Sequence, residues 1–186
     1  MAEKIIINDV GPRDGLQNQA VILEPQQRLA LINALIDAGV KHIEVGSFVS
    51  PVAVPAMRGT DLVVAALPKG DYHFSALIPN LKGYELAKES GIDTVSIVIA
   101  ASNSMNEQNI RMTNAQVLSF AKDVLGRGQV DNFTTLACIA TAWECPFEGL
   151  VPEKTVIDLC GELLAAGAPE VVLADTIGAA SPAQVK

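Results

Sequence analysis

Short apolar runs alternate with segments of helical period along this chain. Six runs rich in β-branched residues predict strands at about 4–9, 40–46, 72–78, 93–99, 133–140 and 169–174. Between them, segment 24–38 places Leu29, Ile32, Leu35 and Ile36 on one helical face, and Gly39 ends it. The same pattern predicts helices at about 80–90, 114–126 and 152–166, a shorter one at 60–66, and the start of another at 181–183.

The predicted strands are apolar throughout rather than alternating, which indicates a parallel sheet covered by helices. Two α/β architectures fit this pattern. Six strands favour an open doubly wound sheet, because a (β/α)8 barrel needs eight units and typically about 250 residues. Polar residues after every strand favour the barrel instead, since its strands all end at one mouth. These residues are Arg13, Asp14, Glu44, Ser47, Asn80, Ser102, Asn103, Thr141, Glu144, Asp175 and Thr176.

Composition narrows the class of protein. With 186 residues, 49% of them hydrophobic, the chain is expected to form one domain over 1–186. A net charge of −8 without a Lys/Arg stripe argues against nucleic acid as a partner. Apolar runs too short for a membrane span, and an N-terminus without a signal-type pattern, lead us to expect a soluble, cytoplasmic protein. The chain also lacks the glycine-rich loops that hold nucleotide phosphates.

The stretch 10–18 (VGPRDGLQN) combines turn residues with Arg13, Asp14 and two carboxamides. One interpretation is structural: Asp14 caps the next helix and Arg13 pairs with a surface carboxylate. The other is a functional site at the end of the first strand. Spacing alone leaves both open.

Histidines and cysteines provide little further chemistry. His42 and His73 are expected to be structural or on the surface, His73 because it starts a strand, at the wrong end for a barrel site. The three cysteines match neither a disulfide scaffold nor a zinc motif, so reduced thiols are expected. Cys138 and Cys160 are predicted to lie in the core, and Cys145 to be buried near the mouth.

Five ordered strings resemble 3-hydroxy-3-methylglutaryl-CoA (HMG-CoA) lyases, from about residue 5 to the end. They are 10–18 (VGPRDGLQN), 43–44 (IE) with 47–51 (SFVSP), 79–83 (PNLKG), 145–149 (CPFEG) and 175–178 (DTIG). The Arg-Asp-Gly element followed by Gln is shared with a wider metal-dependent group that includes isopropylmalate and homocitrate synthases. The GLQN and SFVSP strings are more specific to the lyases.

The resemblance implies a (β/α)8, pyruvate-carboxyltransferase-like barrel that cleaves HMG-CoA to acetyl-CoA and acetoacetate with Mg²⁺ or Mn²⁺. Asp14 matches a metal ligand of the family, and Arg13 a cation facing the developing enolate or carbonyl oxygen. Glu44 and Asp175 match acidic active-site residues, with the general base left open. Without the motifs, Glu44 reads as a surface carboxylate and Asp175 as a helix cap. Arg13, Gln17, Ser47 and Thr141 are expected to bind the acyl-CoA substrate.

The chain departs from the family in two places. Trp143 and Glu144 stand where the lyases usually have smaller residues. The family's His-x-His pair, the following asparagine and the glycine-rich loop with a reactive cysteine are not found in these 186 residues. We therefore expect the chain to be roughly the first three fifths to three quarters of a lyase domain, and inactive alone.

Three functions stay open at this point. The first is the acyl-CoA carbon–carbon lyase, with a homodimer as its expected state. The second is a Claisen-type synthase of the same barrel group, which joins acetyl-CoA to a 2-oxo acid. The third is a non-catalytic association module, because an incomplete barrel exposes a strand edge through which copies associate.

Overall fold

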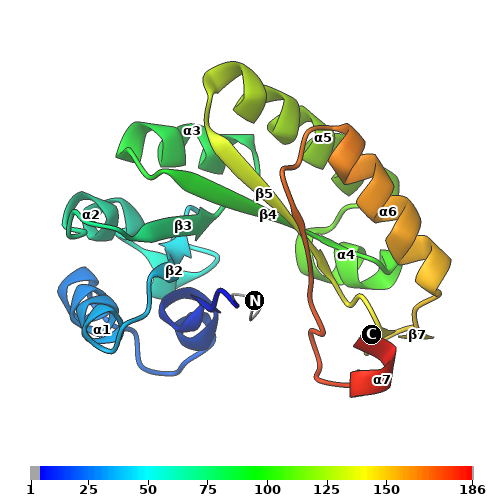
Figure 1. The fold of residues 1–186 in the computed structure, drawn as a ribbon, viewed down its shortest axis with the longest axis horizontal. Helices are drawn as coiled ribbons and strands as arrows, with labels where there is room; N and C mark the ends of the chain where they lie inside the picture. Colours follow the sequence, from blue (N-terminus) through cyan, green and yellow to red (C-terminus); the bar gives the residue numbers. More distant parts are fainter. Residues whose placement is uncertain (1–4, 186) are drawn as a thin grey trace. The chain divides into compact units, whose positions relative to one another are not determined.

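The computed structural model describes residues 5–185, which form two compact units that divide after Val95 (Figure 1). We describe each unit separately. Both are built from strands that are followed by helices, as the apolar runs and helical segments of the sequence predict.

The first unit contains β1 (Asn8–Asp9), β2 (His42–Ser47) and β3 (His73–Leu77), which pair in parallel in this order. Strand β1 is shorter than the predicted run at 4–9, of which residue 4 lies outside the described residues. Ile5, Ile6 and Ile7 precede it and are exposed. Within the described chain β1 pairs only with β2, so these residues lack the second neighbouring strand that would bury them.

Helices α1 (Pro25–Asp37), α2 (Thr60–Ala65) and α3 (Leu81–Ser90) follow these strands, with a 3₁₀ turn at η2 (Pro55–Met57). Pro25 starts α1, as predicted. The Asn80 side chain caps α3 by accepting from the Gly83 amide at 2.9 Å, and Gly91 ends that helix with φ 77°. The core of this unit includes fully buried Ile32, Ile43 and Val45.

The second unit contains β4 (Thr94–Ala100), which begins at the unit boundary, β5 (Thr134–Ala140) and β8 (Val171–Leu173), in that order. β5 and β8 pair in parallel, with Ala137 opposite Val171. A short antiparallel hairpin of β6 (Glu144–Cys145) and β7 (Gly149–Leu150) was not predicted. Its strands are two residues each, too short to show a period in the sequence.

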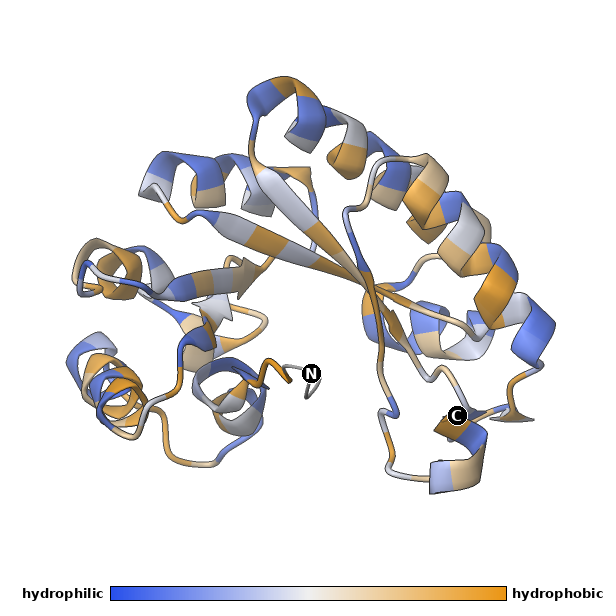
Figure 2. Ribbon diagram, in the orientation of Figure 1, coloured by the Kyte–Doolittle hydropathy of each residue, from blue (hydrophilic) through white to orange (hydrophobic). Residues whose placement is uncertain are grey.

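Helices α4 (Asn103–Ile110), α5 (Asn114–Asp131), α6 (Glu153–Ala165) and α7 (Pro182–Val185) complete the second unit. α5 and α6 lie side by side and both contact β5 (Figure 1). The residues of β8 and many of those of α6 are themselves hydrophobic (Figure 2). Among residues 5–185, no helix combines the length and the apolar character that crossing a membrane requires.

Candidate functional site

A tight turn at the end of β1 holds Arg13 and Asp14. The turn is the π-type element η1 (Gly11–Gly15), in which the Arg13 and Asp14 amides both donate to the Val10 carbonyl, at 3.1 and 2.7 Å. The Asp9 side chain accepts from the Gly11 amide at 2.8 Å, and a Cβ on Gly11 would come within 2.9 Å of the same oxygen. Such turns often occur at functional sites. Asp14 does not cap the next helix, because α1 begins at Pro25 and its N-cap residue is Glu24.

Arg13 bridges two carboxylates of different exposure. Its Nε donates to Glu44 Oε1, and its Nη1 donates to Asp14 Oδ1 at 2.7 Å. The Glu44 side chain is only 6% exposed, whereas that of Asp14 is 56% exposed. Gln17 Nε2 donates to Asp14 Oδ1 at 3.2 Å. We call Arg13, Asp14, Gln17 and Glu44 the arginine cluster.

Three members of the arginine cluster offer groups that a carbon–carbon cleavage could use. Arg13 offers a permanent cation with a planar set of donors, which can stabilise charge developing on an oxygen. Glu44 lies inside β2 and is buried, so the alternative of a surface carboxylate is wrong. Its burial against a guanidinium fixes the direction in which Arg13 points. Asp14 keeps a carboxylate at the surface of the first unit, where it can reach a ligand.

Ser47 lies on the same strand as Glu44 but is engaged with the sheet. Its hydroxyl donates to the Leu77 carbonyl at 3.1 Å, and the residue is 2% exposed. The pairing of β2 with β3 shifts between Glu44 and Gly46, so a β-bulge separates Ser47 from Glu44. Its predicted substrate contact therefore stays a prediction.

The second unit gathers a different set of polar groups at the ends of β4 and β5. Ser102 donates to Cys145 Sγ at 2.9 Å and lies 3.5 Å from the Thr141 hydroxyl. All three residues are buried. Thr141 has φ 53°, in the left-handed region that β-branched residues rarely adopt. Its amide donates to Thr176 Oγ1 at 2.7 Å, which joins the end of β5 to the segment after β8.

Asp175 organises the loop in which it lies. Its Oδ1 accepts from the Ala179 amide at 3.0 Å and its Oδ2 from the Ala180 amide at 2.9 Å. The predicted alternative was a helix cap, but these amides lie in a loop and α7 begins only at Pro182, so Asp175 caps a loop and not a helix. A catalytic role for Asp175 stays a prediction.

Trp143 and Glu148 each join two segments of the second unit, and neither contact was predicted. Glu148 Oε1 accepts from the Ser104 amide at 2.6 Å, which ties the β6–β7 hairpin to the start of α4. Trp143 Nε1 donates to the Gln184 carbonyl at 3.0 Å, in α7. Trp143 is one of the two residues that depart from the lyase pattern, whereas Glu148 lies in the matching string 145–149.

The remaining chemistry-bearing side chains lie away from the arginine cluster or are structural. His42 and His73 stack with ring centroids 4.3 Å apart, at the starts of β2 and β3, as a structural role predicts. No disulfide joins the cysteines of the described chain. Cys145 is buried as predicted, but Cys138 and Cys160 are partly exposed, so their assignment to the core is wrong. Cys138 lies on β5, whose burial alternates along the strand, and Cys160 lies on a partly covered face of α6.

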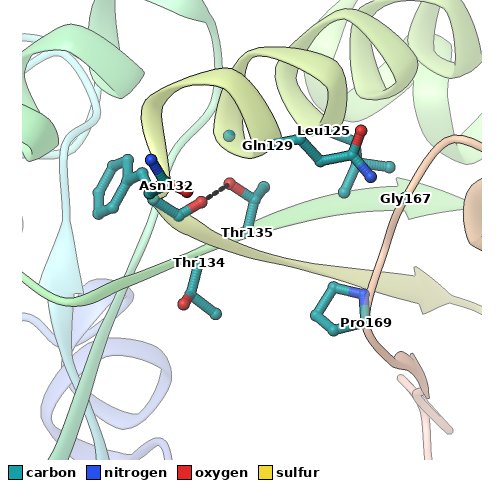
Figure 3. A pocket seen from close by; sticks show the side chains of 9 residues that line it. Leu125, Gln129, Asn132, Thr134, Thr135, Gly167 and Pro169 are labelled. Atoms are coloured by element: carbon teal, nitrogen blue, oxygen red, sulfur yellow. Dashed lines mark hydrogen bonds between the residues drawn. The ribbon is translucent and has the colours of Figure 1, made fainter.

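A pocket of about 340 Å³ lies in the second unit, between the end of α5 and the start of β5 (Figure 3). Gln129, Asn132 and Thr135 line it, together with Gly167 and Pro169. It carries no ionisable side chain and lies at the amino end of β5, whereas Ser102, Thr141 and Cys145 meet near the carboxyl end of that strand. It therefore has none of the groups that acid–base chemistry requires.

The residues of the arginine cluster suit a divalent cation as one part of a ligand set. Mg²⁺ and Mn²⁺ prefer oxygen ligands, and Asp14 presents an exposed carboxylate of this kind. Within residues 5–185 no group of three or more His, Cys, Asp or Glu side chains is arranged to hold a metal ion. Asp14 would hold such an ion only together with further ligands.

Comparison with known proteins identifies relatives. The HMGL-like family matches residues 4–186. The (R)-citramalyl-CoA lyase of Chloroflexus aurantiacus is 41% identical, over 98% of this chain and 61% of its own length. The hydroxymethylglutaryl-CoA lyase YngG of Bacillus subtilis is 39% identical, over 99% of this chain and 62% of its own length.

Solved structures agree with these sequence relatives. The HMG-CoA lyase of Bacillus subtilis superposes with a TM-score of 0.94 at 39% identity, over 99% of this chain and 62% of that structure. An HMG-CoA lyase of Acinetobacter baumannii, in complex with coenzyme A and 3-methylmalate, gives 0.91 at 36% identity, over 97% and 59%. These lyases are (β/α)8 barrels, so the predicted barrel-type fold is confirmed and the open doubly wound sheet is wrong.

The chain spans about three fifths of the length of these relatives. This fraction agrees with the expectation that part of a lyase domain is present. Because the family match covers residues 4–186 and the two relatives align over 98% and 99% of the chain, this chain belongs to the HMGL-like family.

Proposed function

We propose that the protein containing this chain is a divalent-cation-dependent lyase that cleaves HMG-CoA to acetyl-CoA and acetoacetate. The observation that carries the proposal is the arginine cluster, in which Arg13 pairs with buried Glu44 while Asp14 stays exposed beside it. The named activities of the relatives support the reaction type, since the two sequence relatives described above are both acyl-CoA lyases.

The reaction needs few protein groups. A base takes the proton of the tertiary 3-hydroxyl, the bond between C2 and C3 breaks, and C3 becomes the ketone carbonyl of acetoacetate. The electron pair passes to the thioester as an enolate, which takes up a proton to give acetyl-CoA. Arg13 stabilises the negative oxygen, and Glu44 holds the Arg13 guanidinium in that direction. Which residue acts as the base is open.

Asp14 would hold the divalent cation as one of its oxygen ligands. When bound, the cation supplies electrophilic polarisation of substrate oxygens. Gln17, which donates to Asp14 Oδ1 at 3.2 Å, would help to orient the Asp14 carboxylate. We propose Mg²⁺ or Mn²⁺ because the carboxylate is a hard oxygen donor.

A second candidate substrate is citramalyl-CoA, because a citramalyl-CoA lyase is 41% identical to this chain. Its acyl group has one methylene fewer than HMG-CoA between the tertiary alcohol and the free carboxylate. The same bond cleavage would then release acetyl-CoA and pyruvate. One methylene in a binding pocket changes kcat/KM by about 10- to 200-fold, so the two substrates can be ranked.

The test uses the full-length protein that contains this chain, with Mg²⁺ and each thioester in turn. Acetoacetate release from HMG-CoA is the expected result, and the Arg13→Met variant should lose about 10³-fold in kcat. Arg58→Met is the control, because that arginine side chain is 69% exposed and forms only a 3.6 Å ion pair with Glu24. Pyruvate release alone would favour the second substrate. Turnover of neither, or an active Arg13→Met variant, would contradict the proposal.

A further inference from the structure

A cation is completely buried in the first unit, away from the chemistry described so far. Arg28 lies on α1 with none of its surface exposed. Its Nη1 donates to the Ala56 carbonyl at 3.0 Å and approaches Met57 Sδ at 3.8 Å, and its Nη2 donates to Thr60 Oγ1 at 3.3 Å. Its Nε is buried without a hydrogen-bond partner among the described residues.

This placement is costly for a side chain whose only task is to fill space. Desolvation lowers the pKa of Arg28, and the charge of nearby Asp61 offsets that effect only in part. No ion pair of Arg28 with a carboxylate occurs in the part of the chain described, and its partners are a carbonyl, a thioether and a hydroxyl. An apolar residue of similar volume commonly stabilises such a site more than a buried charge does. We therefore attribute the presence of a guanidinium at this position to the hydrogen bonds that it donates in fixed directions, and not to the space that it fills.

Thr60 links Arg28 to strand β2. Its hydroxyl accepts from Arg28 and donates to the Met57 carbonyl at 2.8 Å, so its rotamer is fixed from both sides. The same side chain lies against the backbone of Gly46 on β2. A Cβ built on Gly46 would come within 2.7 Å of Thr60 Oγ1 and 2.9 Å of Thr60 Cγ2.

Gly46 lies at the bulge of β2. Glu44 pairs with Ser75 and Gly46 pairs with Ala76, so Val45 is the extra residue of this strand. Bulges change the direction of neighbouring side chains and are frequent beside active sites. Here the bulge follows Glu44 directly, and Glu44 is the residue that binds Arg13 Nε.

We propose that Arg28 and Thr60 are positioning residues that hold the β2 bulge and thereby set how Glu44 presents Arg13 to the substrate. This inference rests on the proposed lyase function. The path of contact is continuous. Arg28 donates to Thr60, and Thr60 packs against Gly46. Gly46 follows the bulged residue Val45, which itself follows Glu44 on β2. Neither Arg28 nor Thr60 contacts Arg13 or Glu44 through a hydrogen bond given by the structure.

The experiment compares variants of the full-length protein. Thr60→Val keeps the shape but removes the hydroxyl, and Arg28→Met removes the donors at similar volume. We expect each to lower kcat about tenfold while KM changes less than about twofold, because misplacement remote from the chemistry impairs the reacting geometry. Thr60→Ser should recover most of the rate. Thr135→Val is the matched control, because Thr135 is equally buried and its hydroxyl donates to the Phe133 carbonyl at 3.2 Å (Figure 3).

A second measurement does not depend on turnover. The ¹H–¹⁵N resonance of Arg13 Nε reports its hydrogen bond to Glu44, and it should move in Thr60→Val and Arg28→Met but not in Thr135→Val. The proposal is overturned if both variants only lower Tm and leave kcat, the pH–rate profile and this resonance as in the control. If the parent protein cleaves neither thioester, the proposed function fails, and the resonance still decides whether the network positions Arg13.

Discussion

Breaking the ion pair between Arg13 and Glu44 is the perturbation whose size the structure defines best. The two side chains are 14% and 6% exposed, so water screens their interaction only weakly. Two unit charges about 4 Å apart interact by about 4 kcal/mol at the effective dielectric found near a protein surface, against about 1 kcal/mol in bulk water. Part of this is offset by the desolvation of both groups.

We therefore expect Glu44→Gln to lower the free energy of unfolding by about 3 kcal/mol, the low end for a broken buried pair. The low end applies because Arg13 keeps its contact with Asp14. In a double-mutant cycle with Arg13→Met, the coupling energy between the two sites should be about 2 kcal/mol. Urea denaturation, followed by circular dichroism, measures the unchanged full-length protein, the two single variants and the double variant.

A second cycle on Lys154 and Asp158 provides the control. This pair lies one turn apart on α6, with side chains 83% and 60% exposed, and should couple by only about 0.3–0.5 kcal/mol. If Arg13 and Glu44 couple no more strongly than this surface pair, burial does not strengthen their interaction. The reasoning that Glu44 holds the guanidinium would then be refuted.

Three further predictions concern packing, a buried amide and a thiol. Gly46→Ala should lower the free energy of unfolding by about 1–3 kcal/mol, because the added Cβ would clash with Thr60. Gly126→Ala is the control, since a Cβ there would lie in open space on α5, and it should raise the free energy of unfolding by about 0.5–1 kcal/mol. Thermal melts measure both. Asn106→Ala should cost about 2–3 kcal/mol in chemical denaturation, because buried Asn106 binds both the amide and the carbonyl of Ala100; an unchanged midpoint would contradict this. Burial raises the pKa of the Cys160 thiol, so its stabilising contribution is present below the unfolded pKa and is lost as pH rises through the folded one. Alkylation of Cys160 should therefore reach its half-maximal rate at a higher pH in the folded protein than in urea.

Strands β2, β3, β4, β5 and β8 were predictable because strands of a helix-covered parallel sheet are short apolar runs bounded by turn residues. Helix α4 was missed for the opposite reason. Its sequence NSMNEQNI has no apolar period, and the helix is held by side-chain contacts such as that of Asn106 with Asn114 at 2.8 Å. Helix α5 runs five residues beyond its predicted end at 126, through Gly128, where a Cβ would come within 2.8 Å of the Phe133 carbonyl. That close approach is a tertiary contact, and helical period cannot predict it.

The residues in and around the candidate site also include some that were predictable from the sequence and some that were not. Strand-end position and motif pointed to Arg13, Asp14 and Glu44, and the structure brings these three into contact. Arg28 gave no such indication, because a cation within the helical period of α1 is read as solvent-facing. Its neighbour one turn later, Ile32, is also fully buried, so the covered face of α1 includes a position that the pattern of apolar residues leaves out.

The left-handed backbone conformation of Thr141 lowers the stability of the fold, and this cost has a consequence for how the position would evolve. An L-residue in this region costs about 1–2 kcal/mol, and a glycine at the same position would carry almost none of that cost. A population evolved only for heat resistance should therefore drift toward glycine at 141. A population evolved for turnover should keep the threonine if the hydroxyl beside Ser102 serves the reaction. Sequencing both populations would show, without any assay of a purified protein, whether this strained position is retained for chemistry.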